Sequence, residues 1–362
     1  MGKLDVREVA ATTKIRRFHI SIFAMCSLVI IFDGYDLAVT GTALPAIMNQ
    51  MHITSAQAGI MISAALIGMM FGAVVFGILA DRFGRRKTIV ACIFLFSAFT
   101  ALSGLADNPV SFGALRFIAG LGIGGAMPNV VAQMIEYSPR KVRSTMVTLM
   151  FAGYSVGGIL ASVMCKALLG EFGWQSVFYI AAFPVLLIPA FVMWMPESLS
   201  YLVRTGETSE LSAIVSKLDS GCRPSPVDVL PQPVDVKYRT PSVRQLFEDG
   251  RAFSTLMIWL AFFMGLFIVY ALISWLVKLM AAAGFSLGSA LNFALLINVG
   301  GIIGGIFSGW LSDRINIRTV LVGMYLLATI SIALLGFKVP TWAVSVLVAV
   351  AGASTIGTQT LM

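Results

Sequence analysis

Charged side chains are scarce in this sequence, which is 362 residues long. Only 12% of its residues are Asp, Glu, Lys or Arg, about half of the roughly 25% in a soluble globular domain. Water is therefore not the solvent around most of the chain. Histidine occurs twice, and no two of the four cysteines form a CxxC pair. No H-E-x-x-H or G-x-S-x-G motif occurs either, so an enzyme, a metal site and a disulfide framework are not expected.

Apolar side chains are in excess, at 58% of the residues and a mean hydropathy of +0.90. They fall in runs of about 20 residues, and a helix of that length crosses roughly 30 Å of hydrocarbon. The sequence therefore predicts an all-α membrane protein with ten spans. The expected spans cover residues 18–44, 58–80, 88–105, 110–135, 145–168, 177–195, 253–279, 287–311, 320–337 and 342–362.

Basic side chains are distributed unevenly along the chain. Twenty-one of the 25 Lys and Arg lie on one side if the runs cross the membrane alternately. Loops rich in Lys and Arg stay in the cytoplasm, so we expect a multi-pass protein of the cell (inner or plasma) membrane with a cytoplasmic N-terminus. This topology accounts for the net charge of +8, and no nucleic-acid partner is expected.

The chain has an internal repeat. Residues 1–195 are expected to form a six-helix bundle with a cytoplasmic tail, 196–252 a central cytoplasmic linker, and 253–362 an incomplete bundle of four spans. An offset of 232 residues matches the second span with the eighth and the fourth with the tenth. A parallel repeat predicts a transporter with its site near the middle of the bilayer. The matched pairs are Gly68 and Gly300, Gly72 and Gly304, Gly77 and Gly309, Asp81 and Asp313, Arg82 and Arg314, Arg86 and Arg318, Gly120 and Gly352, and Gly125 and Gly357.

The loop GILADRFGRRK, residues 77–87, matches the G-x-x-x-D-R-x-G-R-R signature of the major facilitator superfamily. The sequence GWLSDRINIR, residues 309–318, is similar to a weaker second copy of that signature. This resemblance implies a major facilitator fold of two six-helix bundles related by the parallel repeat. The superfamily has twelve spans, so the second bundle is expected to be incomplete in this chain.

Four further stretches resemble the aromatic acid:proton symporters, and most closely the benzoate transporters. They are FDGYD (32–36), RFIAGLGIGGAMPN (116–129), EYSPRKVRS (136–144) and PESLSYL (196–202). The resemblance implies a symporter that imports an aromatic carboxylic acid, such as benzoate or a hydroxybenzoate. A drug/proton antiporter of the same superfamily is the alternative. The direction of transport distinguishes the two, because a symporter accumulates the acid and an antiporter lowers its internal level.

Two acidic side chains, Asp33 and Asp36, lie three residues apart on one face of the first span. An ionised carboxylate at mid-membrane costs roughly 2.5 to 3.5 kcal/mol. Burial and a neighbouring carboxylate both favour the protonated acid, so the pair is expected to couple transport to protons. The alternative is a permanently ionised, purely structural pair held by Arg116.

Arg116 is the basic residue that lies deep within a span, at a depth similar to that of Asp36. It is expected either to pair with Asp36 or to bind the substrate carboxylate through its planar guanidinium. Asn129 is a further candidate for that carboxylate. The aromatic residues Tyr35 and Tyr270 are candidates for the walls of the substrate site, together with Tyr154 and Trp275, although an aromatic residue in a span more often faces lipid.

The loop around residues 77–87 is expected to act as a cytoplasmic gate, with Asp81 bonded to neighbouring helix ends and bases. The alternative is that its basic residues only set the topology. The expected gate consists of Gly77, Asp81, Arg82, Gly84, Arg85, Arg86, Glu136, Arg143, Asp313 and Arg314.

The expected mechanism is alternating access, in which the two bundles rock about a central site. The proton is the expected coupling ion, and no metal or organic cofactor is expected. The expected partners are the small aromatic carboxylate and the lipid bilayer, and the protein is expected to be a monomer.

Overall fold

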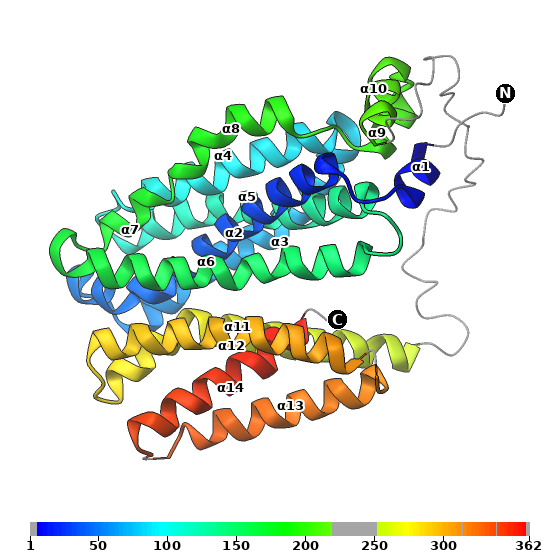
Figure 1. Ribbon diagram of the computed structural model, residues 1–362. Helices are drawn as coiled ribbons and strands as arrows, with labels where there is room; N and C mark the ends of the chain where they lie inside the picture. Colours follow the sequence, from blue (N-terminus) through cyan, green and yellow to red (C-terminus); the bar gives the residue numbers. More distant parts are fainter. Residues whose placement is uncertain (1–5, 219–251, 313, 338, 360–362) are drawn as a thin grey trace.

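The computed structural model describes residues 6–218, 252–312, 314–337 and 339–359, and these form helices without a strand (Figure 1). Ten helical segments are long and apolar enough to cross a membrane, which confirms the expected spans; one of them, Gln175–Trp194, combines two helices. The helices are α1 (Val6–Thr12), α2 (Arg17–Met51), α3 (Ser55–Phe83), α4 (Arg85–Ser103), α5 (Pro109–Tyr137), α6 (Arg143–Phe172), α7 (Gln175–Ile180), α8 (Phe183–Trp194), α9 (Leu199–Thr205), α10 (Thr208–Leu218), α11 (Ala252–Ala282), α12 (Leu287–Ser312), α13 (Ile317–Leu334) and α14 (Thr341–Gln359).

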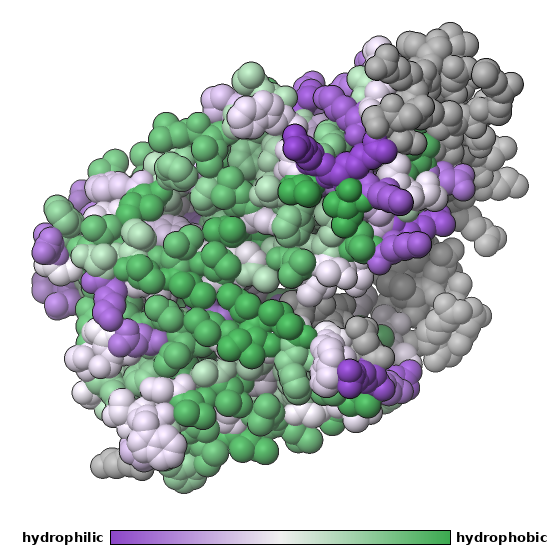
Figure 2. Space-filling view, viewed as in Figure 1, coloured by the Kyte–Doolittle hydropathy of each residue, from purple (hydrophilic) through white to green (hydrophobic). Residues whose placement is uncertain are grey.

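Polar residues mark where the spans begin and end. Thr54 caps the start of α3, because its hydroxyl accepts a hydrogen bond from the N–H of Gln57 at 3.3 Å. Asn108 caps α5 in the same way and is followed by Pro109, which has no N–H to leave unpaired at the first helical position. Between these ends, apolar side chains cover much of the surface, and hydrophilic residues gather at the two ends of the helices (Figure 2).

The repeat predicted from the offset appears as two similar pairs of closely packed helices. A Cβ placed on Gly68 of α3 would collide with the carbonyl oxygen of Phe117 in α5. In the second half, a Cβ on Gly300 of α12 would collide with the carbonyl oxygen of Ala349 in α14. The absence of a side chain lets the backbones approach, as small residues do in membrane helices. The matched glycines therefore serve the same purpose in both halves.

Helices α2–α8 pack together, and α11–α14 form a second group that meets the first through α2, α6, α11 and α12. Side-chain hydrogen bonds join the groups at one end of the helices. Lys278 donates to Ser55, and Lys166 donates to Asn292. Both lie at the end of the helices opposite α1, α9 and α10. A buried apolar cluster at this end also draws on both groups, so the bundles are in contact there.

The other end of the first group, where α1, α9 and α10 lie, is called the basic end here (Figure 1). The structure differs from the linker expected over 196–252, because residues 199–218 form α9 and α10 and pack against the bundle. Leu211, Val215 and Leu218 are fully buried, in one cluster with Val6 and with residues of α2 and α5. These apolar residues recur at helical spacing and bury one face of each short helix. Residues 219–251 lie outside the described part of the chain.

The sixth span is broken in two. α7 ends at Ile180, Ala181 and Ala182 form a turn, and α8 begins at Phe183. Pro184 carries no N–H that could bond to the carbonyl of Ile180, four residues earlier, so the helix cannot continue through this point undisturbed. The break faces the middle of α2.

Candidate functional site

The centre of the first helix group holds a buried ion pair between α2 and α5. Arg116 Nη1 lies 2.6 Å from Asp36 Oδ1, and the two side chains are 2% and 1% exposed. Thr100 of α4 completes the cluster, because its hydroxyl donates to Asp36 Oδ1 at 2.5 Å and accepts from Arg116 Nη1 at 2.7 Å. Arg116 Nη2 also donates to the backbone carbonyl of Asp36 at 3.2 Å. The pairing expected between Arg116 and Asp36 is thus present.

Asp33 lies one helical turn before Asp36 and is also buried, with 1% of its surface exposed. Among the described residues neither its Oδ1 atom nor Oδ2 of Asp36 has a hydrogen-bond partner. The phenol groups of Tyr154 and Tyr270 lie beside each other and close enough to Asp33 to interact with it electrostatically. The site therefore contains two carboxylates and one guanidinium, so its charges balance only if one carboxylic acid carries a proton.

A small central cavity lies on the far side of Arg116, between α2, α3, α5 and α11. Arg116, Thr40, Tyr270 and Ser274 bring polar groups to its lining. Its volume is about 10 Å³, which is room for about one water molecule. The position is that expected for a substrate site between the bundles, but the cavity is closed in this conformation. Gly41 explains the tight closure, because a Cβ there would collide with the carbonyl oxygen of Ile273 in α11.

Two residues expected at the substrate site lie elsewhere. Tyr35 donates its hydroxyl to the carbonyl of Val177 in α7 at 2.7 Å, on the side of α2 away from the central cavity. Asn129 donates to the carbonyl of Gly125 in its own helix at 2.8 Å. It follows Arg116 by 13 residues, which is about 20 Å along a helix. One carboxylate cannot contact both, so Asn129 and Arg116 do not form a single site here.

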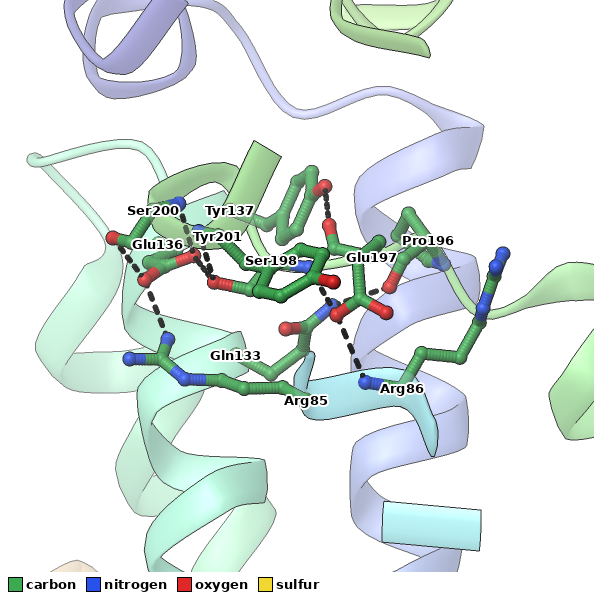
Figure 3. Close-up of polar contacts among 10 residues, drawn as sticks. All are labelled: Arg85, Arg86, Gln133, Glu136, Tyr137, Pro196, Glu197, Ser198, Ser200 and Tyr201. Atoms are coloured by element: carbon green, nitrogen blue, oxygen red, sulfur yellow. Dashed lines mark hydrogen bonds and ion pairs between the residues drawn. The ribbon is translucent and has the colours of Figure 1, made fainter. Parts of the chain in front are cut away.

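A second polar cluster lies at the basic end of the bundle (Figure 3). Glu136, at the end of α5, forms an ion pair with Arg85 of α4 at 2.5 Å, and both side chains are less than one-fifth exposed. Its carboxylate also accepts hydrogen bonds from the hydroxyls of Ser198 and Ser200 at 2.8 and 2.6 Å. Glu136 thereby ties α4, α5 and the start of α9 together.

Glu197 forms the other half of this cluster (Figure 3). Its Oε1 accepts from the backbone N–H of Arg86, in the first turn of α4, at 3.0 Å, where a carboxylate is favoured by the helix dipole. Gly84 precedes this turn with φ of +96°, and a Cβ there would overlap the Glu197 carboxylate. Gln133 and Tyr137 fix the same segment by donating to the carbonyls of Pro196 and Glu197 at 2.7 and 2.6 Å.

Several residues of the expected gate lie outside this cluster. Asp81 is exposed, and the bonds expected from it to helix ends and bases are not found among the described residues. Glu197 instead occupies the start of α4. A Cβ on Gly77 would meet no atom within 4 Å, so no close approach requires that glycine. Arg143 donates to the nearby carbonyl of Ser138 at 3.2 Å, on its own loop.

The remaining gate residues are basic side chains at the ends of α3 and α12. The Arg82 guanidinium lies 5.4 Å from the ring centroid of Phe83, and that of Arg314 lies 4.2 Å from the ring centroid of Trp310. Each guanidinium therefore contacts an aromatic ring that is close to it in sequence, as basic residues at membrane surfaces do. Asp313 lies outside the described residues.

Sequence reasoning missed Thr100, Thr40 and Ser274, because one hydroxyl among many in apolar runs gives no signal of its position. Glu197 gave a signal that was not used. It is an acidic residue directly after the sixth apolar run, in a stretch that the family resemblance had already singled out. No group of His, Cys, Asp and Glu suited to a metal ion occurs in the described part of the chain.

Ten spans, a repeated pair of close-packed helices and a buried charged cluster beside a cavity between two bundles define a polytopic membrane transporter. The model of the Major Facilitator Superfamily matches residues 26–362. The chain belongs to the major facilitator superfamily.

Known relatives agree with this assignment. The chain is 41% identical to the benzoate transport protein of Acinetobacter baylyi, over 99% of this chain and 78% of that protein. It is 36% identical to the 4-hydroxybenzoate transporter PcaK of Pseudomonas aeruginosa, over 90% of this chain and 73% of that protein. The partially occluded inward-open structure of the xylose transporter XylE from E. coli aligns with a TM-score of 0.73 and 17% identity, covering 95% of this chain and 83% of that chain. This last likeness concerns the fold alone.

Proposed function

We propose that this protein is a proton-coupled symporter that imports an aromatic carboxylic acid, such as benzoate or a hydroxybenzoate, by alternating access. The observation that carries the proposal is the buried pair of Asp36 and Arg116, which borders a cavity between the two bundles. The 41% identity to a benzoate transport protein supports the substrate class. The proposal places the protein in the cell membrane with its basic end in the cytoplasm.

The coupling follows from competition for one guanidinium. While Asp36 is ionised, its Oδ1 lies 2.6 Å from Arg116 Nη1, and the guanidinium is not available to a substrate carboxylate. Protonation of Asp36 frees the guanidinium, and a substrate carboxylate then replaces the lost partner. Proton and anion therefore each strengthen the binding of the other. Asp33, which lacks a hydrogen bond on Oδ1 among the described residues, is the second acid that can hold a proton at this depth.

Substrate access requires the two bundles to move. A central cavity of about 10 Å³ cannot hold an aromatic ring, and the bundles are joined at the end opposite the basic end. Separation at either end enlarges the space beside Arg116, Tyr270 and Ser274. We take the present conformation to be a closed state between the two open ones.

The proposal is tested by uptake of radiolabelled benzoate into proteoliposomes under an inward proton gradient. Asp33→Asn and Asp36→Asn are expected to abolish accumulation, because each removes a titratable group from the buried site. Asp107→Asn, which alters an exposed loop acid, is the matched control and is expected to accumulate benzoate normally. Normal accumulation by both buried-site variants would refute the coupling, and benzoate export driven by the gradient would favour a drug/proton antiporter.

The substrate role of Arg116 is tested separately by benzoate binding to purified protein. Arg116→Lys keeps the charge but loses the planar fork, so it is expected to weaken binding, and Arg116→Ala to abolish it. Equal affinity in wild type and Arg116→Ala would exclude Arg116 from the site.

A further inference from the structure

Contacts between α3 and α11 close the route from the central cavity to the end of the helices opposite the basic end, called the outer end here. Lys278, near the end of α11, donates to the hydroxyl of Ser55, the first residue of α3. One turn further along α3, a Cβ on Gly59 would lie 3.7 Å from the ring of Trp275. Both helices then line the central cavity itself. The contacts therefore run in order from the outer end to the cavity.

Lys278 lies on the face of α11 that borders the central cavity. Tyr270, Ser274 and Lys278 follow one another at intervals of four residues, so they share one face of the helix. Tyr270 and Ser274 line the cavity, and Lys278 lies about 6 Å further toward the outer end, since a helix rises 1.5 Å per residue. Its ammonium group is therefore at the outer mouth of the cavity.

The positive charge of Lys278 is not neutralised in this conformation. None of the ion pairs among the described residues includes it. Its ammonium group donates to the neutral hydroxyl of Ser55 and lies 5.0 Å from the centroid of the Trp275 ring. A carboxylate accepts a shorter and stronger hydrogen bond from an ammonium group than a neutral hydroxyl does. An anion that reaches the mouth from outside can therefore replace Ser55.

Trp275 provides an aromatic surface beside this charge. The ring is only partly buried, and its outer edge faces Gly59, which has no side chain to cover it. When α3 and α11 separate, this part of the ring becomes accessible. A further aromatic ring can then pack on it, edge to face or with an offset stack. A cation and an aromatic ring on one helical turn match the two halves of a benzoate-like molecule.

We propose that Lys278 and Trp275 form an outer subsite that binds the aromatic carboxylate before it reaches Arg116, an inference that rests on the proposed function. The carboxylate replaces Ser55 as the partner of Lys278, and the aromatic ring packs on Trp275. This exchange removes the outermost contact between α3 and α11. Anion binding therefore favours the conformation that is open at the outer end.

Uptake kinetics in proteoliposomes test the role of the charge. Lys278→Gln is expected to raise the KM for benzoate several-fold, and Lys278→Arg, which keeps the charge, is expected to stay close to the wild-type value. Higher ionic strength is expected to raise the KM of wild type but to have little effect on Lys278→Gln, because salt screens an exposed charge. An unchanged KM in Lys278→Gln would overturn the inference.

Lys166 provides the matched control. It also lies at the outer end and donates across the bundles, to Asn292 at 3.0 Å. It belongs to α6, however, and none of the described residues that line the central cavity comes from α6. Lys166→Gln therefore loses a bond between the bundles without loss of the subsite, and it is expected to keep the wild-type KM. An equal rise of KM in Lys166→Gln and Lys278→Gln would reduce Lys278 to a closing contact and overturn the inference.

Photolabelling with 4-azidobenzoate in lipid nanodiscs, followed by mass spectrometry, gives a measurement that does not need transport. Label is expected on Trp275 in wild type and in Lys166→Gln, and several-fold less in Lys278→Gln. Benzoate is expected to protect Trp275 at a concentration about tenfold lower than benzamide, which has the same ring but no charge. No label on Trp275, or equal protection by benzamide, would overturn the inference. Because labelling needs no proton gradient, its outcome is independent of the proposed symport.

Discussion

The buried pair of Arg116 and Asp36 gives the sharpest prediction about stability. In Arg116→Met the side chain keeps much of its length but loses its charge, and Asp36 remains with the Thr100 hydroxyl as its hydrogen-bond donor. Removing one partner of a buried ion pair costs about 3–5 kcal/mol, because the other charge is left uncompensated. The free energy of unfolding in detergent, measured by denaturant titration, is expected to fall by that amount.

Two further variants separate the ion pair from other effects. In Asp36→Asn/Arg116→Met neither buried charge remains, so most of the lost stability is expected to return. Arg82→Met, at an exposed position, is expected to change the free energy of unfolding by less than about 1 kcal/mol. A single variant as stable as wild type, or a double variant no better than the single one, would refute this reasoning.

Three other measurements follow from the structure. Gly84→Ala is expected to lower the free energy of unfolding by about 1–3 kcal/mol, because Gly84 has φ of +96° and a Cβ there would overlap the Glu197 carboxylate. Gly77→Ala is the control, since a Cβ there meets no atom within 4 Å, and equal thermal stability of the two variants would contradict the prediction. Glu136→Gln is expected to lower the free energy of unfolding by about 1–3 kcal/mol, because the ion pair with Arg85 is lost. Asp81→Asn changes an exposed residue and is expected to lower it by less than about 0.5 kcal/mol. The reverse order would show that Asp81 stabilises this conformation. Co-transport of one proton with one monoanion moves no net charge, so benzoate uptake is expected to follow the pH gradient and not to respond to a potassium-diffusion potential, which acts on a net charge with about 2.3 kcal/mol per 100 mV. A strong response to the potential would exclude this stoichiometry.

Local sequence determined the number of spans and the pairing of the halves. A run of about 20 apolar residues must form a helix in hydrocarbon, because no water is available to bond its backbone. The ten spans followed from that rule alone. The offset of the glycines predicted equivalent helix pairs, since only small residues let backbones approach. The pairing of Asp36 with Arg116 could be predicted from their similar depths in the membrane, because charged side chains within spans pair with one another.

Tertiary structure decided which polar groups these residues meet and where empty space lies. The rotation of each helix about its own axis decides where Thr100, Tyr35 and Asn129 point. Neighbouring side chains set this rotation, and an apolar sequence without a clear polar face does not reveal it. The polar cluster at the basic end is built on Glu136 and Glu197 and does not include Asp81, because residues 196–218 pack against the bundle through contacts distant in sequence. The cavity of about 210 Å³ between α2, α4, α6 and the broken span α7–α8 likewise exists only because a broken helix packs beside α2 and α6. Such voids arise from the packing of four helices, and no single segment encodes them.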